Sequence, residues 1–203
     1  MSQESRLYRV LLLNVSMIAG LVIVGLSSHS LGVLAAGADF AADSIAIGLG
    51  IMAIRFSHHP HGHPKATSIV ALINSVILLI VTASVLFGGI NRLRTNTPHI
   101  EGLSVLVVSV VAAIVMVISA LILGRDAGKE DLHMRSVLLD TIADGASATA
   151  VAVTGGIIFI TGRFFWIDSL VSVIIGLIVG YNAVKLLKDV IRSLSQRNPV
   201  KLS

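Results

Sequence analysis

The chain contains 203 residues, of which 55% are hydrophobic and 13% charged, and its mean hydropathy is +0.92. This composition excludes an ordinary soluble domain, in which about a quarter of the residues are charged. There is no cysteine, which excludes disulfide bonds and thiolate metal ligands. The net charge of +4 does not indicate a nucleic-acid partner, because the basic residues are scattered between apolar runs and form no basic helix face.

Six apolar runs follow one another along the chain, each long enough to cross a hydrocarbon core of about 30 Å as a helix. No run alternates polar and apolar residues, which excludes transmembrane strands. We therefore predict an all-α polytopic membrane protein, embedded in the lipid bilayer, with a single transmembrane domain over residues 1–203. The predicted helices cover about residues 7–26, 31–54, 66–90, 102–123, 137–160 and 167–187.

The lysines and arginines predict how the chain is oriented. With six spans, both termini lie on the same side of the membrane. If that side is the cytoplasm, 12 of the 15 basic residues are cytoplasmic, and only Arg92, Arg94 and Arg163 lie outside. Cytoplasmic loops carry an excess of Lys and Arg, so we expect cytoplasmic termini. We also expect the bacterial inner membrane, because no targeting presequence is recognisable.

Two pairs of carboxylates interrupt the predicted spans. Asp39 and Asp43 lie in the second span, and Asp140 and Asp144 lie in the fifth. Each charge costs about 2.5 to 3.5 kcal/mol to place in a membrane, so something must offset that cost. Residues four apart share one helix face. If the two faces oppose one another, the four carboxylates meet in a small volume that suits a divalent cation.

Spacing alone leaves other interpretations of these carboxylates open. They could be structural and held by polar groups of other helices, or they could form a proton relay or a channel vestibule. A pore would more naturally carry a ring of acidic residues, so the paired motifs fit an enclosed site better. Small residues surround both pairs, including Gly37 and Gly145, and indicate that helix backbones approach closely there.

Several motifs resemble those of one transporter family. Residues 30–44 (SLGVLAAGADFAADS) resemble the second-helix motif of the cation diffusion facilitators, which are proton-coupled exporters of divalent transition metals. Residues 61–65 (HGHPK) resemble the family's element after helix two, and residues 140–144 (DTIAD) occupy the place where many zinc members have His-x-x-x-Asp. Residues 166–169 (WIDS) resemble the start of helix six, and the resemblance covers residues 7 to about 194.

The resemblance implies that the protein exports a divalent metal by alternating access. We expect Asp39, Asp43, Asp140 and Asp144 to be the metal ligands. There is no nucleotide-binding glycine loop and no catalytic constellation, so we expect no enzymatic activity, no prosthetic group and an ion gradient as the driving force. Two rival functions remain, a metal-binding scaffold or accessory protein without transport and a divalent cation channel.

The sequence departs from the family pattern in three ways. The family usually carries a cytosolic metal-binding domain after helix six that assists dimerisation. We expect no such domain here, and a homodimer that forms through the transmembrane helices. The loop after helix two lacks the acidic residue of the accessory metal site that some relatives have. Four histidines in this loop are nevertheless a candidate site of cytosolic metal capture. The prolines of the loop also suit a solvated turn without a metal. These histidines are His58, His59, His61 and His63.

The third departure concerns metal choice. Asp140 stands where zinc members often have histidine. Oxygen ligands shift preference toward Mn²⁺ or Fe²⁺, although Zn²⁺ and Cd²⁺ also accept carboxylates. Zinc is the usual substrate of the family, so we expect Zn²⁺ with Cd²⁺ as a companion, and we keep Mn²⁺ and Fe²⁺ as close alternatives.

The number of carboxylates also indicates how transport is driven. Four ionised carboxylates around one divalent ion leave a net charge of about −2, so their mutual repulsion should retain some protons when no metal is bound. We expect the arriving metal to displace one or two protons, and protonation from the opposite side to expel the metal. H⁺ would then be the counter-ion of an antiporter.

Other polar or small residues in the spans carry weaker signals. We expect Asp168 to cap the start of the last span. The pair Gly176 and Gly180 is expected to serve a helix contact within the chain. Asn14, Asn74 and Asn182 could hydrogen-bond across helices or line the ion path, and we expect the structural role.

Overall fold

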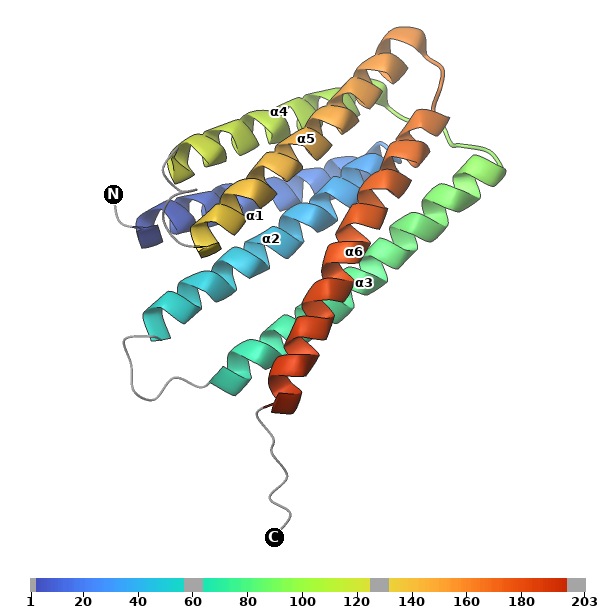
Figure 1. The fold of residues 1–203 in the computed structure, drawn as a ribbon. Coiled ribbons are helices and arrows are strands. Elements are labelled where there is room, and N and C mark those ends of the chain that lie inside the picture. The colour runs from blue at the N-terminus through green and yellow to red at the C-terminus, as the bar shows by residue number, and fades with distance from the viewer. Residues whose placement is uncertain (1–2, 57–63, 125–131, 197–203) are drawn as a thin grey trace.

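The computed structural model describes residues 3–56, 64–124 and 132–196, which form six helices and no strand (Figure 1). This confirms the predicted all-α fold. Several helices extend beyond the apolar runs, because a helix continues through the polar residues that flank its membrane-spanning part. The helices are α1 (Gln3–Ser27), α2 (Leu31–Phe56), α3 (Pro64–Arg94), α4 (Gly102–Leu123), α5 (Leu132–Thr161) and α6 (Trp166–Gln196).

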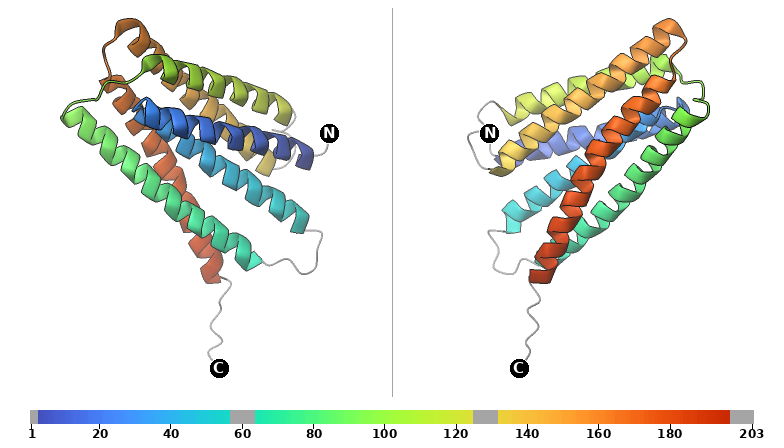
Figure 2. Two further views of the ribbon diagram at one scale, coloured as in Figure 1. Left: turned by 180° about the vertical axis from the view of Figure 1, so that it is seen from behind. Right: turned by 45° about the vertical axis from the view of Figure 1, so that its right-hand side comes forward.

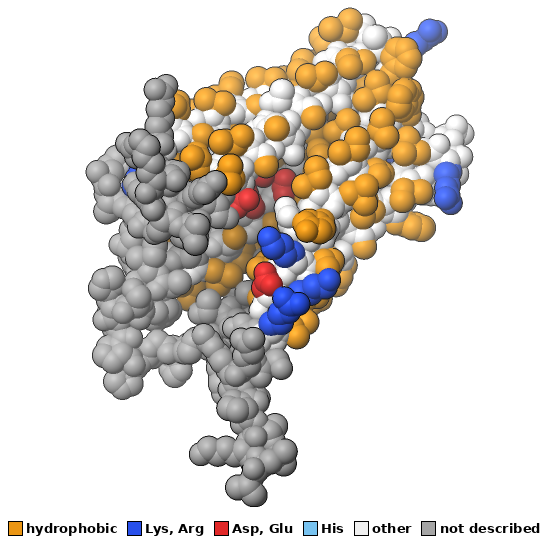
Figure 3. Space-filling view, in the orientation of Figure 1, with side chains coloured by type: hydrophobic (Ala, Val, Ile, Leu, Met, Phe, Trp, Pro, Cys, Tyr) orange, Lys and Arg blue, Asp and Glu red, His pale blue; other side chains and the backbone are white. Residues whose placement is uncertain are grey.

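Every one of these helices contains a segment long and apolar enough to cross a membrane. The outer surface is largely apolar (Figure 3), and large side chains such as Leu12, Phe87 and Ile160 are exposed on it. An apolar surface of this extent matches hydrocarbon rather than water. The chain is therefore an integral membrane protein. The spans are Ser5–Ser27, Leu31–Leu49, Ser75–Arg94, Gly102–Leu123, Val137–Thr161 and Trp166–Arg192.

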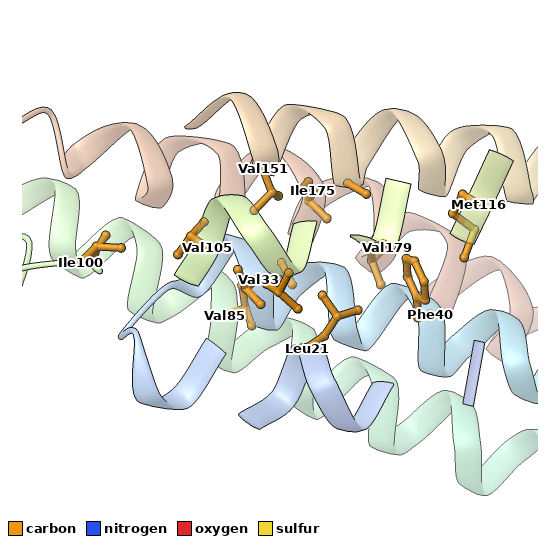
Figure 4. Close-up of a cluster of buried hydrophobic side chains, with 14 of the residues drawn as sticks. Leu21, Val33, Phe40, Val85, Ile100, Val105, Met116, Val151, Ile175 and Val179 are labelled. Atoms are coloured by element: carbon orange, nitrogen blue, oxygen red, sulfur yellow. The ribbon is translucent and has the colours of Figure 1, made fainter. Parts of the chain in front are cut away.

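Helix α2 lies at the centre of the fold. It packs against α1, α3, α5 and α6. Val33 and Phe40, one heptad apart on α2, are buried in the main hydrophobic cluster, to which all six helices contribute (Figure 4). Ile47, a further seven residues along, and Ile51, one turn after it, are buried in a second cluster. One face of α2 is thus committed to apolar packing, which leaves another face for its carboxylates.

The helices fall into two groups at the end of the molecule where both chain termini lie, which we call the termini end. There α3 and α6 lie together and diverge from the other four helices (Figures 1 and 2). Among the described side chains, the second hydrophobic cluster joins only those four helices at this end. Its buried members come from α1, α2, α4 and α5, and they are Leu7, Val10, Ile47, Ile51, Leu123 and Val137.

Glycines set the closest helix contacts. An ideal Cβ built on Gly155 of α5 would lie 2.6 Å from the backbone nitrogen of Leu106 on α4, so a side chain there has no room. On α6, Cβ atoms built on Gly176 and Gly180 would lie 3.0 and 3.2 Å from side chains of Leu86 and Thr82 on α3. The pair therefore serves a contact within the chain, as predicted.

We predict that Gly155→Ala destabilises the protein by about 1–3 kcal/mol, because the methyl group would force α4 and α5 apart. Thermal unfolding in detergent micelles measures this effect. The matched control is Gly20→Ala on α1, where a Cβ meets nothing within 4 Å. The control should be neutral or slightly stabilising, since alanine favours a helix by about 1 kcal/mol over glycine. Equal unfolding temperatures for the two variants would contradict the close α4–α5 contact.

Candidate metal site

The start of α2 is capped by a fully buried carboxylate from α6. Asp168 accepts hydrogen bonds from the hydroxyl of Ser30 (2.5 Å), the backbone N–H of Leu31 (2.9 Å) and the backbone N–H of Gly32 (3.3 Å). The Ser30 hydroxyl in turn accepts the N–H of Val33 (3.1 Å). The first three N–H groups of α2, which have no partner inside the helix, are therefore all satisfied.

This arrangement corrects our expectation that Asp168 caps α6, the helix on which it lies. Its carboxylate accepts hydrogen bonds from the start of α2 instead. The two helices are close there, because a Cβ built on Gly32 would lie only 2.8 Å from the Oδ1 atom of Asp168. Arg92 of α3 interacts electrostatically with Asp168 and donates a hydrogen bond to the carbonyl oxygen of His29 (2.6 Å). Helices α2, α3 and α6 are thus tied together at the end opposite the termini end.

The candidate ligands of α2 and α5 face one another about two turns further along α2. Asp144 of α5 is only 3% exposed, and its carboxyl group interacts with those of both Asp39 and Asp43 on α2. Asp140, one turn earlier on α5, is exposed and interacts electrostatically with the same two residues. The spacing placed each pair on one helix face, and the structure brings these two Asp-x-x-x-Asp faces together.

The carboxylates do not form a finished coordination shell in this conformation. Among the described residues, no group of three or more His, Asp or Glu side chains is arranged as a metal site. One oxygen of Asp144 is buried without a hydrogen-bond partner in the described part of the chain. A buried acceptor without a partner costs about 1–3 kcal/mol, and a cation or a proton would remove that cost. Metal binding by the four residues stays a prediction.

A cavity of about 270 Å³ lies beside this cluster, between α2, α3, α5 and α6. Its polar lining comes from Asp39 and Asp43, from Asp140, and from three polar residues of α6. Figure 3 shows acidic and basic side chains gathered on this face. Alanines and aliphatic residues complete the lining and leave space. The α6 residues are Asn182, Lys185 and Asp189, and the others are Ala42, Ala46, Leu78, Val179, Ala183 and Leu186.

Sequence reasoning missed the contribution of α6 to this cavity. We assigned Asn182 a structural role, and we counted Lys185 only as a topological charge. The spacing of Asn182, Lys185 and Asp189, at i, i+3 and i+7 in an apolar helix, could have indicated one polar face. All three side chains are exposed, so the cavity opens to the surface along the C-terminal part of α6, toward the termini end.

The small residues next to the carboxylates serve other contacts than we expected. A Cβ built on Gly37 would meet Leu21 of α1 at 3.3 Å, and one built on Gly145 would meet Met116 of α4 at 3.3 Å. These glycines therefore allow α2 to approach α1 and α5 to approach α4. The close approach of helix backbones is confirmed, but at these two glycines it joins each acidic helix to a neighbour and not the two acidic helices to each other.

The four histidines proposed for metal capture, and the side chain of Asn74, lie outside the described residues. The capture site therefore stays a prediction. The histidines are His58, His59, His61 and His63.

A family model described as "Cation efflux transmembrane domain" matches residues 7–195, which is nearly the whole chain. The chain belongs to the cation efflux family. This confirms the resemblance to the cation diffusion facilitators that the sequence motifs indicated.

Curated relatives carry names that agree with this family. The zinc transporter ZitB of Escherichia coli is 27% identical over 189 residues, which cover 89% of this chain and 59% of the relative. The cadmium, cobalt and zinc/H(+)-K(+) antiporter of Bacillus subtilis is 26% identical over 203 residues, covering 94% and 64%. The metal cation efflux system protein CzcD of Cupriavidus metallidurans is 26% identical over 162 residues, covering 77% and 50%.

The chain thus spans between 50 and 64% of the length of these three relatives. Their bacterial origin and the six membrane-spanning helices together support an integral protein of the bacterial inner membrane.

We predict that Asp168→Asn destabilises the protein by about 1–3 kcal/mol, because an amide keeps one acceptor oxygen where two are used and leaves buried donors of α2 unsatisfied. Thermal unfolding in detergent measures the loss. Glu101→Gln is the matched control, since this exposed residue precedes α4 but makes no side-chain capping bond. If both variants unfold at the temperature of the parent, the cap does not stabilise α2.

Proposed function

We propose that this member of the cation efflux family exports divalent transition-metal cations, with Zn²⁺ favoured and Cd²⁺ as a companion substrate. The observation that carries the proposal is the position of Asp144, which lies buried on α5 against both Asp39 and Asp43 of α2, beside a cavity that opens to the surface. Such a grouping of carboxylates inside a membrane is costly, and a bound divalent cation would offset that cost.

The donor set favours no single metal. Zinc accepts carboxylate oxygens at about 2.0–2.2 Å in tetrahedral geometry, whereas Mn²⁺ and Fe²⁺ suit sites made entirely of oxygen. The relatives named as zinc transporters or as a cadmium, cobalt and zinc antiporter support Zn²⁺ and Cd²⁺ first. Mn²⁺ and Fe²⁺ remain the alternatives. Since no three donors among the residues that the structure describes are grouped as ligands, metal binding would require the carboxylates to move closer together.

We propose protons as the counter-ion. Carboxylates that interact without metal repel one another when ionised, so the empty site should hold protons that an arriving cation displaces. Protonation from the opposite side of the membrane would then weaken the hold on the metal. No nucleotide-binding motif accompanies this site in the sequence, so an ion gradient would supply the energy.

Alternating access could use the two helix groups of the fold. The pair α3 and α6 diverges from the other four helices at the termini end, where the cavity opens, and it is tied to α2 by Asp168 at the opposite end. Rocking of this pair about that tie would close the cavity at one end and open it at the other. With the cytoplasmic termini that the basic residues predict, the observed cavity would face the cytoplasm and receive the metal there.

We also propose that the protein forms a homodimer through its transmembrane helices, as the family resemblance implies. The four histidines between α2 and α3 could capture metal before it reaches the cavity.

We expect metal uptake into sealed vesicles with an imposed pH gradient to depend on the paired aspartates. Asp39→Asn and Asp144→Asn should each reduce zinc uptake by at least about 10- to 100-fold, because even the loss of an outer-shell partner costs that much metal affinity. Glu101→Gln, on an exposed carboxylate at the start of α4, should transport like the parent.

Comparison of Zn²⁺, Cd²⁺, Mn²⁺ and Fe²⁺ in the same vesicles tests the metal preference. Uptake that is retained in both aspartate variants would place the ion path elsewhere. Metal binding without any flux would favour a scaffold, and conductive flux that ignores the pH gradient would favour a channel.

We further expect metal binding to release one or two protons per ion between pH 6 and pH 8, and metal affinity to rise with pH, because protons and metal compete for the same oxygens. A pH indicator in weakly buffered detergent solution measures the release. A variant with Asp39→Asn and Asp144→Asn together should release none. Zinc binding to the parent without proton release would contradict coupling through the carboxylates.

A further inference from the structure

The cavity that holds the acidic residues also holds one basic residue. Lys185 lines it together with Asp39, Asp43 and Asp140, and no other lysine or arginine does so among the described residues. It lies on the face of α6 that also presents Asn182 and Asp189 to the cavity. A positive charge beside a site for a positive ion needs an explanation, since it opposes binding of that ion.

On the basis of the proposed transport function, we infer that Lys185 sets the metal affinity of the cavity. Its ammonium group weakens the attraction of the carboxylates for a divalent cation, so that the cation can leave again in each transport cycle.

The size of the cavity allows this effect. Asn182 and Asp189, which both line the cavity, are seven residues apart on α6, or about 10 Å along the helix axis. This length is comparable with the Debye length of about 8–10 Å at 0.1–0.15 M ionic strength. Salt therefore does not fully screen the ammonium group from a cation held by the carboxylates. Protein and lipid around the cavity focus the field further, because their dielectric constant is low.

The charge balance explains why such a residue would be useful. Five carboxylates, four in the cavity lining and Asp144 beside them, exceed the charge of one divalent ion by three when all are ionised, and Lys185 brings this excess to two. A transported ion must bind well enough to be captured and weakly enough to be released. A fixed positive charge lowers the affinity without removing a ligand, so capture and release can both proceed.

Asp189 gives the lysine another partner. It lies four residues beyond Lys185 on α6, on the same helix face and in the lining of the same cavity. A lysine side chain is long and flexible, so its ammonium group can turn toward Asp189 when a metal occupies the aspartates of α2 and α5. When the cavity is empty, the same group can turn toward those aspartates and reduce their repulsion.

The neighbouring lysine provides a matched control. Lys188 lies one turn further along α6, is exposed, and is not part of the cavity lining. A change there removes the same charge from the same helix. It should alter the field inside the cavity less than a change at Lys185 does, because Lys188 does not line the cavity.

The test is the dissociation constant of Zn²⁺, measured by titration calorimetry on the full chain in lipid nanodiscs. Lys185→Met should bind Zn²⁺ at least about tenfold more tightly than the parent, a change of ~1.4 kcal/mol. Lys185→Gln should show the same gain, and Lys185→Arg should stay close to the parent. Lys188→Met should change the constant less than about twofold. Damage to the fold would weaken binding, so a gain in affinity separates the electrostatic role from a structural one.

Two further measurements sharpen the result. The gain should shrink when KCl is raised from 0.1 to 1 M, because the Debye length falls from about 10 to about 3 Å. In vesicle transport, Lys185→Met should lower both KM and kcat, since the metal is captured more tightly and released more slowly.

Two outcomes would overturn the proposals at different levels. If the parent binds no Zn²⁺, Cd²⁺, Mn²⁺ or Fe²⁺, the proposed function fails and this inference fails with it. If the parent binds metal but Lys185→Met binds it no more tightly than Lys188→Met does, the inference fails alone and the proposed function stands.

Discussion

Charged carboxylates inside hydrocarbon need partners, and this constraint explains most of what is unusual in the structure. A carboxylate at the centre of a membrane helix costs about 2.5–3.5 kcal/mol on insertion scales. In this protein, buried carboxylates have partners at two depths in the membrane. At the end opposite the termini end, Asp168 accepts hydrogen bonds from the start of α2. Nearer the middle of the spans, the aspartates of α2 and α5 lie against one another beside a cavity.

The two acidic positions differ in how completely they are satisfied, and this difference separates structure from proposed function. Asp168 is fully buried and uses both oxygens to hold backbone and hydroxyl donors. Asp144 is also buried, yet one of its oxygens has no hydrogen-bond partner among the described residues and its nearest charged neighbours have the same sign. The first arrangement is stable without a ligand, whereas the second is improved by a cation or a proton.

Helix α2 connects these two positions. Its start is held by α6, one of its faces packs in the hydrophobic clusters, and another presents Asp39 and Asp43 to the cavity. At the termini end, an apolar cluster joins α1, α2, α4 and α5, and none of its members among the described side chains comes from α3 or α6. The fold thus has a four-helix part (α1, α2, α4 and α5) and a two-helix part (α3 and α6), which contacts the first mainly through α2. Such an arrangement suits a rocking movement of the two-helix part against the four-helix part.

The sequence by itself determined the number of helices, their membrane character, the family and the shared helix face of each aspartate pair, because hydropathy, length and i, i+4 spacing are local properties. Tertiary structure alone decided that Asp168 caps α2 rather than α6, that Gly37 and Gly145 face α1 and α4, and that Lys185 lines the cavity of the carboxylates. These outcomes depend on how each helix is rotated about its axis. That rotation is set by packing between segments up to 138 residues apart, which no local pattern contains.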